Sequence, residues 1–107
     1  MISERRKLIF SMDELATAIM AYLFSTNQVS EKDRLGRISL EEGSSPSVKV
    51  EIHRGGGVEP GEIVLKAEAL GALMIAQCIR KKIPMAKRAK KAIVASDGKL
   101  SLVMSLD

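Results

Sequence analysis

The densest group of chemically active side chains in this sequence is basic. The segment RKKIPMAKRAKK, residues 80–91, carries seven of the chain's 17 Lys and Arg residues and no acidic residue. Ammonium and guanidinium groups pair with phosphates and displace the counterions of nucleic acid. We therefore expect contact with an acidic partner, such as nucleic acid or an acidic protein, through Arg80, Lys81, Lys82, Lys87, Arg88, Lys90 and Lys91.

This basic segment also has a second interpretation. Cations that follow the end of a helix offset the helix dipole, and such a segment can be no more than a solvated connector. Outside the segment the chain has ten basic and thirteen acidic residues, so the net charge of +4 comes from residues 80–91. The corresponding segment of the first half, VSEKDRLG, has charges of both signs. The sequence leaves both interpretations open.

Weaker candidate sites lie in the turns. Backbone amides of the segment HRGGG, residues 53–57, could surround an anion with help from Arg54. A flexible linker explains the same glycines, because the strand-to-helix context of a phosphate loop is missing. Two carboxylate pairs could hold a divalent cation or act as acid and base, although solvated turns explain them equally well. These pairs are Glu41 with Glu42 and Glu59 with Glu62.

Cysteine and histidine are too few to predict a catalytic or metal site. Cys78 lies within an apolar segment, where a small core side chain is a better interpretation than a nucleophile. His53 is the single histidine and lacks companions for a typical zinc site. None of the candidate groups has a third residue that would orient it for catalysis. The sequence therefore predicts a non-enzymatic binding or regulatory protein without cofactor or metal.

The composition indicates one folded domain. The chain has 107 residues, of which 46% are hydrophobic and 28% charged, which suits a single domain over residues 1–107. One cysteine cannot form an intramolecular disulfide, and the start MISERRKLIF has too short an apolar run for a signal peptide. The longest apolar stretches, 18–24 and 69–79, are shorter than the roughly 18 residues of a membrane-spanning helix. We therefore expect a cytoplasmic protein without a transmembrane segment.

The residue pattern predicts a strand, a helix and a hairpin in the first half. The strand covers residues 6–10. Ser11 and Glu14 form a capping box, in which hydroxyl and carboxylate bind the opening backbone amides of a helix. Apolar residues recur at helical spacing over residues 12–26, with Asn27 as the stop. Alternating residues then predict a hairpin with strands at 35–41 and 47–54.

The second half shows the same order of elements. A short apolar run predicts a strand at 62–65, and helical spacing covers residues 66–82, where Pro84 is expected to end the helix. Two further strands, at 91–96 and 99–106, flank Asp97 and Gly98. This dipeptide suits a two-residue hairpin turn because both residues tolerate positive φ.

A shift of 55 positions places one half over the other. Leu15 then meets Leu70 and Ile38 meets Ile93. The match predicts an internal repeat of a β-α-β-β unit, residues 6–54 and 62–106, with a linker at 55–61. Alternatively, two amphipathic helices that each follow a strand match by composition alone. In both cases we expect an α+β fold in the order β-α-β-β-β-α-β-β, with two helices on one face of a mostly antiparallel sheet of six strands.

Both predicted helices are more apolar than contact with one sheet requires. Residues 18–24 include no charged side chain, and residues 69–79 include one strongly polar residue, Gln77. This excess predicts a homodimer formed through the helices, because two-fold dimers commonly bury such surface. An apolar-ligand pocket, an adaptor surface for another protein and a deep core are the alternatives. The residues expected at the interface or pocket are Met20, Leu23, Phe24, Met74 and Cys78.

Overall fold

The computed structural model describes residues 3–43, 45–55, 57 and 60–106. Its strands and helices follow the predicted order, which confirms the α+β class. Each predicted boundary lies within two residues of the observed one. The elements are β1 (Glu4–Phe10), α1 (Met12–Ser25), β2 (Arg34–Glu41), β3 (Ser47–His53), β4 (Gly61–Leu65), α2 (Ala67–Arg80), β5 (Lys90–Ser96) and β6 (Lys99–Leu106).

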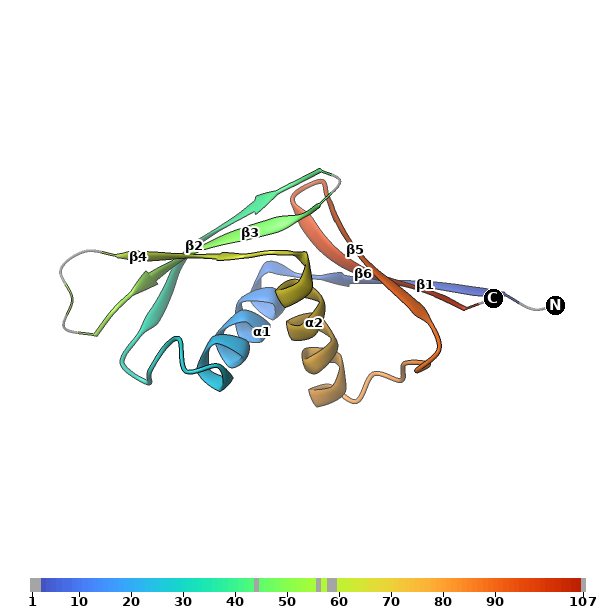
Figure 1. Ribbon diagram of the computed structural model, residues 1–107, viewed down its shortest axis with the longest axis horizontal. Coiled ribbons are helices and arrows are strands. Elements are labelled where there is room, and N and C mark those ends of the chain that lie inside the picture. Colours follow the sequence, from blue (N-terminus) through green and yellow to red (C-terminus); the bar gives the residue numbers. More distant parts are fainter. Residues whose placement is uncertain (1–2, 44, 56, 58–59, 107) are drawn as a thin grey trace.

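The strands form two three-stranded sheets instead of the expected sheet of six. The strand orders are β1-β6-β5 and β2-β3-β4, and all neighbouring strands are antiparallel. Each sheet combines the hairpin of one half with the first strand of the other half. Both helices lie on the same side of the two sheets (Figure 1). Because β1 pairs with the hairpin of the second half and β4 with the hairpin of the first, the two halves are joined within each sheet. The β2-β3 hairpin therefore does not need to pair with the β5-β6 hairpin.

The pairing of β1 with β6 and the pairing of β4 with β3 correspond position by position, whereas β2 contains a bulge between Leu35 and Ile38 that β5 lacks. Phe10 of β1 faces Leu100 of β6, and Leu65 of β4 faces Val48 of β3. The first residues of these pairs lie 55 positions apart, as do the first residues of the two helices and the last ones. The two halves therefore share one backbone plan. Their origin by duplication stays a prediction.

Both helices end through a residue in the left-handed region. Asn27 has φ 60° and Lys82 has φ 57°. The next amide then donates to a carbonyl five positions earlier, at 2.9 Å in both cases. Such a left-handed residue satisfies the last carbonyls of a helix and redirects the chain. The prediction that Pro84 ends α2 was wrong, because the helix already ends at Arg80.

Of the two hydrogen bonds of the predicted capping box, the one accepted by the Ser11 hydroxyl is formed. Ser11 Oγ accepts from the Glu14 amide at 3.1 Å and caps α1. The Glu14 carboxylate was expected on the Ser11 amide, but its Oε1 accepts from Gln77 Nε2 of α2 at 2.7 Å. Lys66, the N-cap of α2, makes no side-chain cap. Glu14 therefore connects the two helices instead of completing the cap of its own helix.

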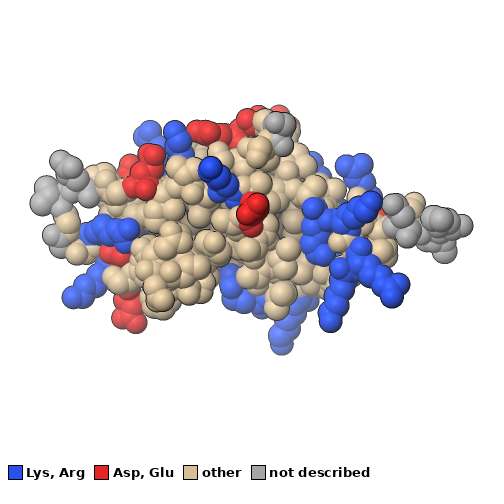
Figure 2. Space-filling view, viewed as in Figure 1, with Lys and Arg blue, Asp and Glu red and all other residues tan. Residues whose placement is uncertain are grey.

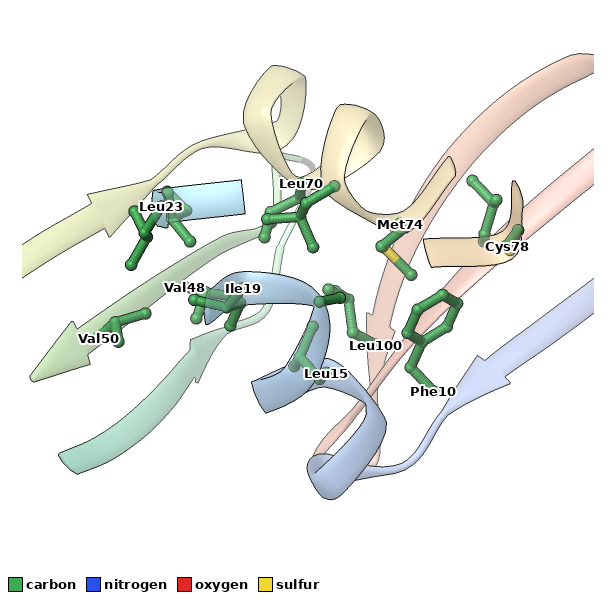
Figure 3. Close-up of a cluster of buried hydrophobic side chains, with 14 of the residues drawn as sticks. Phe10, Leu15, Ile19, Leu23, Val48, Val50, Leu70, Met74, Cys78 and Leu100 are labelled. Atoms are coloured by element: carbon green, nitrogen blue, oxygen red, sulfur yellow. The ribbon is translucent and has the colours of Figure 1, made fainter. Parts of the chain in front are cut away.

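One hydrophobic core joins both helices to both sheets (Figure 3). Leu15 and Ile19 of α1 and the equivalent Leu70 and Met74 of α2 have no exposed surface. Strand residues complete the cluster, among them Phe10, Val48, Val50, Ile52, Leu65, Leu100 and Leu102. Because α1 and α2 also pack against each other, two helices and two sheets bury a larger helix surface than one helix on one sheet would.

This packing accounts for much of the apolar helix surface noted in the sequence. Leu23, Met74 and Cys78 are at most 1% exposed, and Met20 is half-buried. Phe24 is 50% exposed. Three of the five residues expected at an interface or pocket are thus core residues of this chain.

Candidate anion-binding surface

Strand exchange adds the N-terminal cations to the basic segment. β1 carries Arg5, Arg6 and Lys7, and it pairs with β6, which pairs with β5. Arg5 and Lys90 both face Ser105, and Arg6 and Lys91 both face Met104. Cations that are about 85 positions apart in the sequence therefore lie two strands apart, roughly 10 Å between backbones.

We call this surface the basic end, and it occupies the end of the molecule where β1 begins and β6 ends (Figure 2). Among the described residues, none of its cations forms an ion pair. Their charge is therefore available to an outside anion. The basic end comprises Arg5, Arg6, Lys7, Lys87, Arg88, Lys90 and Lys91.

Strand alternation directs these cations to both faces of the sheet. Successive side chains of a strand point to opposite faces. Leu8 packs against the core, so Arg6 points to the helix side and Arg5 and Lys7 point to the outer side. By the same rule Lys90 lies on the outer side. At the basic end, the outer face of this sheet therefore carries three exposed cations, Arg5, Lys7 and Lys90.

The connector between α2 and β5 crosses the helix side of this sheet. Arg6 Nη1 donates to the Pro84 carbonyl at 2.7 Å, which ties β1 to the connector. A turn follows, in which the Ala89 amide donates to the Ala86 carbonyl at 3.1 Å. Lys87 and Arg88 lie between these two residues and are exposed. The connector thus presents cations on the side opposite to Arg5.

The other three predicted cations lie at the end of α2. Arg80 Nε donates to Gln77 Oε1 at 3.0 Å, and Lys81 Nζ lies 3.8 Å from Glu14 Oε1. Lys82 is the left-handed residue that ends the helix. Arg80 and Lys81 are therefore engaged by side chains of this chain, whereas Arg6 and Lys91 of the basic end donate to backbone carbonyls.

A buried carboxylate ties the connector between α1 and β2 to the segment that follows β3. Asp33, which is 8% exposed, accepts from the Ser30 amide at 2.8 Å and from the Gly55 amide at 3.0 Å. Its Oδ2 also lies 3.2 Å from Arg54 Nη1. These bonds to Ser30 and Gly55, together with the Arg54 cation, hold the pKa of Asp33 below its ordinary value although partial burial opposes them.

This arrangement changes the interpretation of the glycine-rich segment. Arg54 and the Gly55 amide do surround an anion, but the anion is Asp33 of the same chain. These two groups are therefore not free for an external phosphate, which corrects the anion site proposed from the sequence. Gly56, within the same segment, lies outside the described residues.

The remaining polar candidates are paired or exposed. Glu41 lies 3.3 Å from Lys49, and Glu42 accepts from the Gly98 amide at 3.2 Å. His53 Nε2 lies 2.7 Å from Glu51 Oε1. Glu62 is exposed, while its predicted companion Glu59 lies outside the described residues. Within the described chain, no group of three or more His, Cys, Asp and Glu residues could hold a metal ion.

A groove of about 480 Å³ runs beside the free edge of β1. Leu8, Phe10, Cys78 and Ile83 supply its apolar lining. Burial raises the pKa of the Cys78 thiol, which keeps it protonated. Of the five residues expected at an apolar pocket, the groove includes Cys78 but none of the other four, so the geometry does not favour the predicted pocket.

Sequence reasoning missed Arg5, Arg6 and Lys7 as members of the site. The run ERRK, residues 4–7, overlaps the start of the first predicted strand and is visible in the sequence. Its proximity to residues 87–91 depends on the pairing of β1 with the last strand of the chain. This proximity would have been predicted if the two units had been expected to exchange their first strands.

None of the helices in the described part of the chain is long and apolar enough to cross a membrane. Comparison with known proteins gave no match: no family model, curated protein or solved structure is similar to this chain. Functional inference therefore depends on the chemistry of the basic end.

Proposed function

We propose that this protein is a non-enzymatic binding protein that holds a polyanionic partner, nucleic acid in the first place, through the basic end. The observation that supports this proposal is the convergence of seven cations from β1, the connector and β5 that form no ion pair among the described residues. Unpaired cations gathered at one end repel one another, so their joint placement is favourable when a polyanion binds.

The opposite sheet provides an internal control for this interpretation. At positions equivalent to the seven cations by strand register and turn, the first half and β4 carry two basic and two acidic residues, Lys32, Arg34, Glu31 and Glu62. Because the backbone plan is shared, the strand and connector architecture does not itself require cations at these positions. Their accumulation at one end supports a binding role over simple solvation.

Salt-dependent binding of labelled nucleic acid tests the proposed function. The full-length protein should bind in low salt, and the logarithm of the association constant should fall linearly with the logarithm of salt concentration. Replacement of Lys87, Arg88, Lys90 and Lys91 by Glu should abolish binding. The control is Arg34→Glu with Arg37→Glu on exposed positions of β2, which should retain most of it. Equal loss in the control would contradict the proposal.

We also propose that the protein forms a homodimer through the exposed ends of its helices. Phe24 and Ile79, at equivalent positions of α1 and α2, are 50% and 64% exposed. The two helices lie side by side with their C-terminal ends on the same side of the molecule (Figure 1). Light scattering should therefore give a dimer, and Phe24→Asp with Ile79→Asp should give a monomer. A monomeric wild-type protein at high concentration would refute the dimer.

A further inference from the structure

The two sheets have four free strand edges in the described part of the chain, and β5 is the edge with the least protection. A free edge offers unpaired backbone groups to foreign strands, and native proteins protect it with charges, bulges or short strands. β1 carries three cations, a bulge after Leu35 interrupts β2, and β4 has only five residues, one of them Glu62. In contrast, β5 pairs with β6 in an unbroken register and has no charge beyond Lys91. A foreign strand therefore meets the fewest obstacles at β5.

The turn between β5 and β6 determines which backbone groups of β5 face outward. Asp97 and Gly98 have φ 54° and 73°, and Ser96 faces Lys99 across this two-residue turn. The two residues that flank such a turn bond to each other, and bonding residues then alternate along the ladder. Every second residue of β5, counted back from Ser96, therefore bonds to β6, and the residues between them direct N–H and C=O to the free edge. These outward-directed residues are Lys91, Ile93 and Ala95.

A groove of about 610 Å³ runs between this free edge and α2. Ala92 and Ile93 line it from β5, and Gly71, Ala72 and Ile75 line it from α2. Because Gly71 and Ala72 are small, they leave room for side chains of another segment. A strand added to β5 would lie roughly 4.8 Å from it, and every second side chain of that strand would point to the groove side.

The apolar groove has cations at the end where β5 begins. A second groove of about 360 Å³ shares Ile75 and Lys91 with the first, and Ile79, Met85 and Lys87 also line it. The Ile79 side chain is 64% exposed. The two grooves together therefore offer apolar contacts along α2 and positive charge at one end.

We infer that the free edge of β5 binds an extended segment of a partner protein as an added antiparallel strand, with alternating apolar residues and an acidic C-terminal end. In this mode of recognition, backbone hydrogen bonds supply affinity and pockets for alternate side chains supply specificity. An antiparallel strand ends where β5 begins, so its acidic residues meet Lys87, Lys90 and Lys91. β5 of a second copy would bring two lysines and no carboxylate, so charge complementarity favours a different chain.

Fluorescence anisotropy with the labelled peptide TVTVTVEE and the full-length protein tests the inference. Binding should be saturable, and the peptide TVTVTVKK should bind at least about tenfold more weakly, because like charges then meet. N-methylation of alternate residues gives two further peptides, which differ in the edge that has lost its donors. One of them should lose binding and the other should stay within a factor of about three of the parent, because only one edge of an added strand bonds to β5.

Two variants of the protein test the edge and the groove separately. Ala95→Pro removes an outward-directed N–H but no ladder bond, and edge strands tolerate proline. Ala72→Lys places a long side chain in the groove, although its charge alone would attract the acidic peptide. Each should weaken peptide binding at least about tenfold, whereas the control Thr17→Lys, at the equivalent exposed position of α1, should change it less than about threefold. Thermal unfolding verifies that each variant is folded.

The possible outcomes separate this inference from the proposed polyanion binding. Absence of saturable binding, full binding by folded Ala95→Pro, or equal effects of the two N-methylated peptides would overturn strand addition. A wild-type dimer that Ala95→Pro converts to a monomer in light scattering would show that a second copy occupies the edge, and would overturn the assignment to a partner protein. Ala95→Pro and Ala72→Lys leave all cations of the basic end in place, so both should still bind nucleic acid.

Discussion

The connector after α1 and the connector after α2 follow the same backbone plan but treat charge in opposite ways. In the first, Asp33 is held by Ser30, Gly55 and Arg54, so the charges compensate one another inside the chain. In the second, Ala89 occupies the position equivalent to Asp33, and the neighbouring Arg88 has no ion pair among the described residues. The comparison shows that one backbone plan carries internally compensated charge at one end of the molecule and unpaired cations at the other.

The largest effect is expected where the two halves are the same. Leu15→Ala and Leu70→Ala each remove a fully buried side chain at equivalent positions. Each should reduce the free energy of unfolding by about 2–5 kcal/mol, because a cavity remains in the core. Urea denaturation of both variants measures the two losses. A loss below about 1 kcal/mol for one of them would show that the halves do not contribute equally to one core.

A smaller loss of stability is expected at Asp33, where the halves differ. Its pKa is lowered below the ordinary value of 3.8, so it stabilises the folded state at higher pH, and this contribution disappears as the pH falls through the folded-state pKa. Asp33→Asn should therefore lower the thermal midpoint at pH 7 by less than Leu15→Ala does. The difference from wild type should vanish below that pKa. Thermal unfolding from pH 7 to pH 2.5 measures the effect; a pH-independent difference would contradict it.

A change in affinity is expected when the second connector is made like the first. Arg88→Asp replaces an exposed cation of this connector by an acidic residue beside Ala89, which occupies the position equivalent to Asp33. The position equivalent to Arg54 is Leu106 in β6, so the new carboxylate gains no cation there. Binding of labelled nucleic acid should weaken severalfold, and the slope of log K against log salt should become shallower by about 1. Anisotropy titrations at several salt concentrations measure both values, with Asp33→Arg as the reciprocal variant that should destabilise the fold.

The smallest effect is expected at the ends of the helices. Lys82→Gly removes the steric cost of a side chain at φ 57° and should stabilise the protein by about 0.5–1 kcal/mol. Asn27→Gly at φ 60° should gain less, because asparagine tolerates the left-handed region better than lysine does. Urea denaturation of the pair ranks the two gains. Destabilisation by Lys82→Gly would show that the lysine side chain makes a contact that outweighs the backbone strain.

The strands, the helices and their order were predictable because local patterns determine them. Alternation identified β3, helical spacing identified α1 and α2, and Asp97-Gly98 identified the last hairpin, where both residues have positive φ. Part of the candidate site, residues 87–91, was also visible as a run of like charge. The hydrogen bonds of Arg54 and Gly55 to Asp33 could not be predicted, because they join residues more than twenty positions apart that belong to no known spacing pattern.

By itself, the sequence determined the type and order of the elements and the concentration of charge, because these depend on neighbouring residues. Tertiary structure alone decided that β1 pairs with β6, that six strands divide into two sheets and that Arg5, Arg6 and Lys7 join the basic connector. The physical reason is that a strand edge offers the same backbone hydrogen bonds to many partners. The choice among them depends on how all the apolar faces of the chain are buried together.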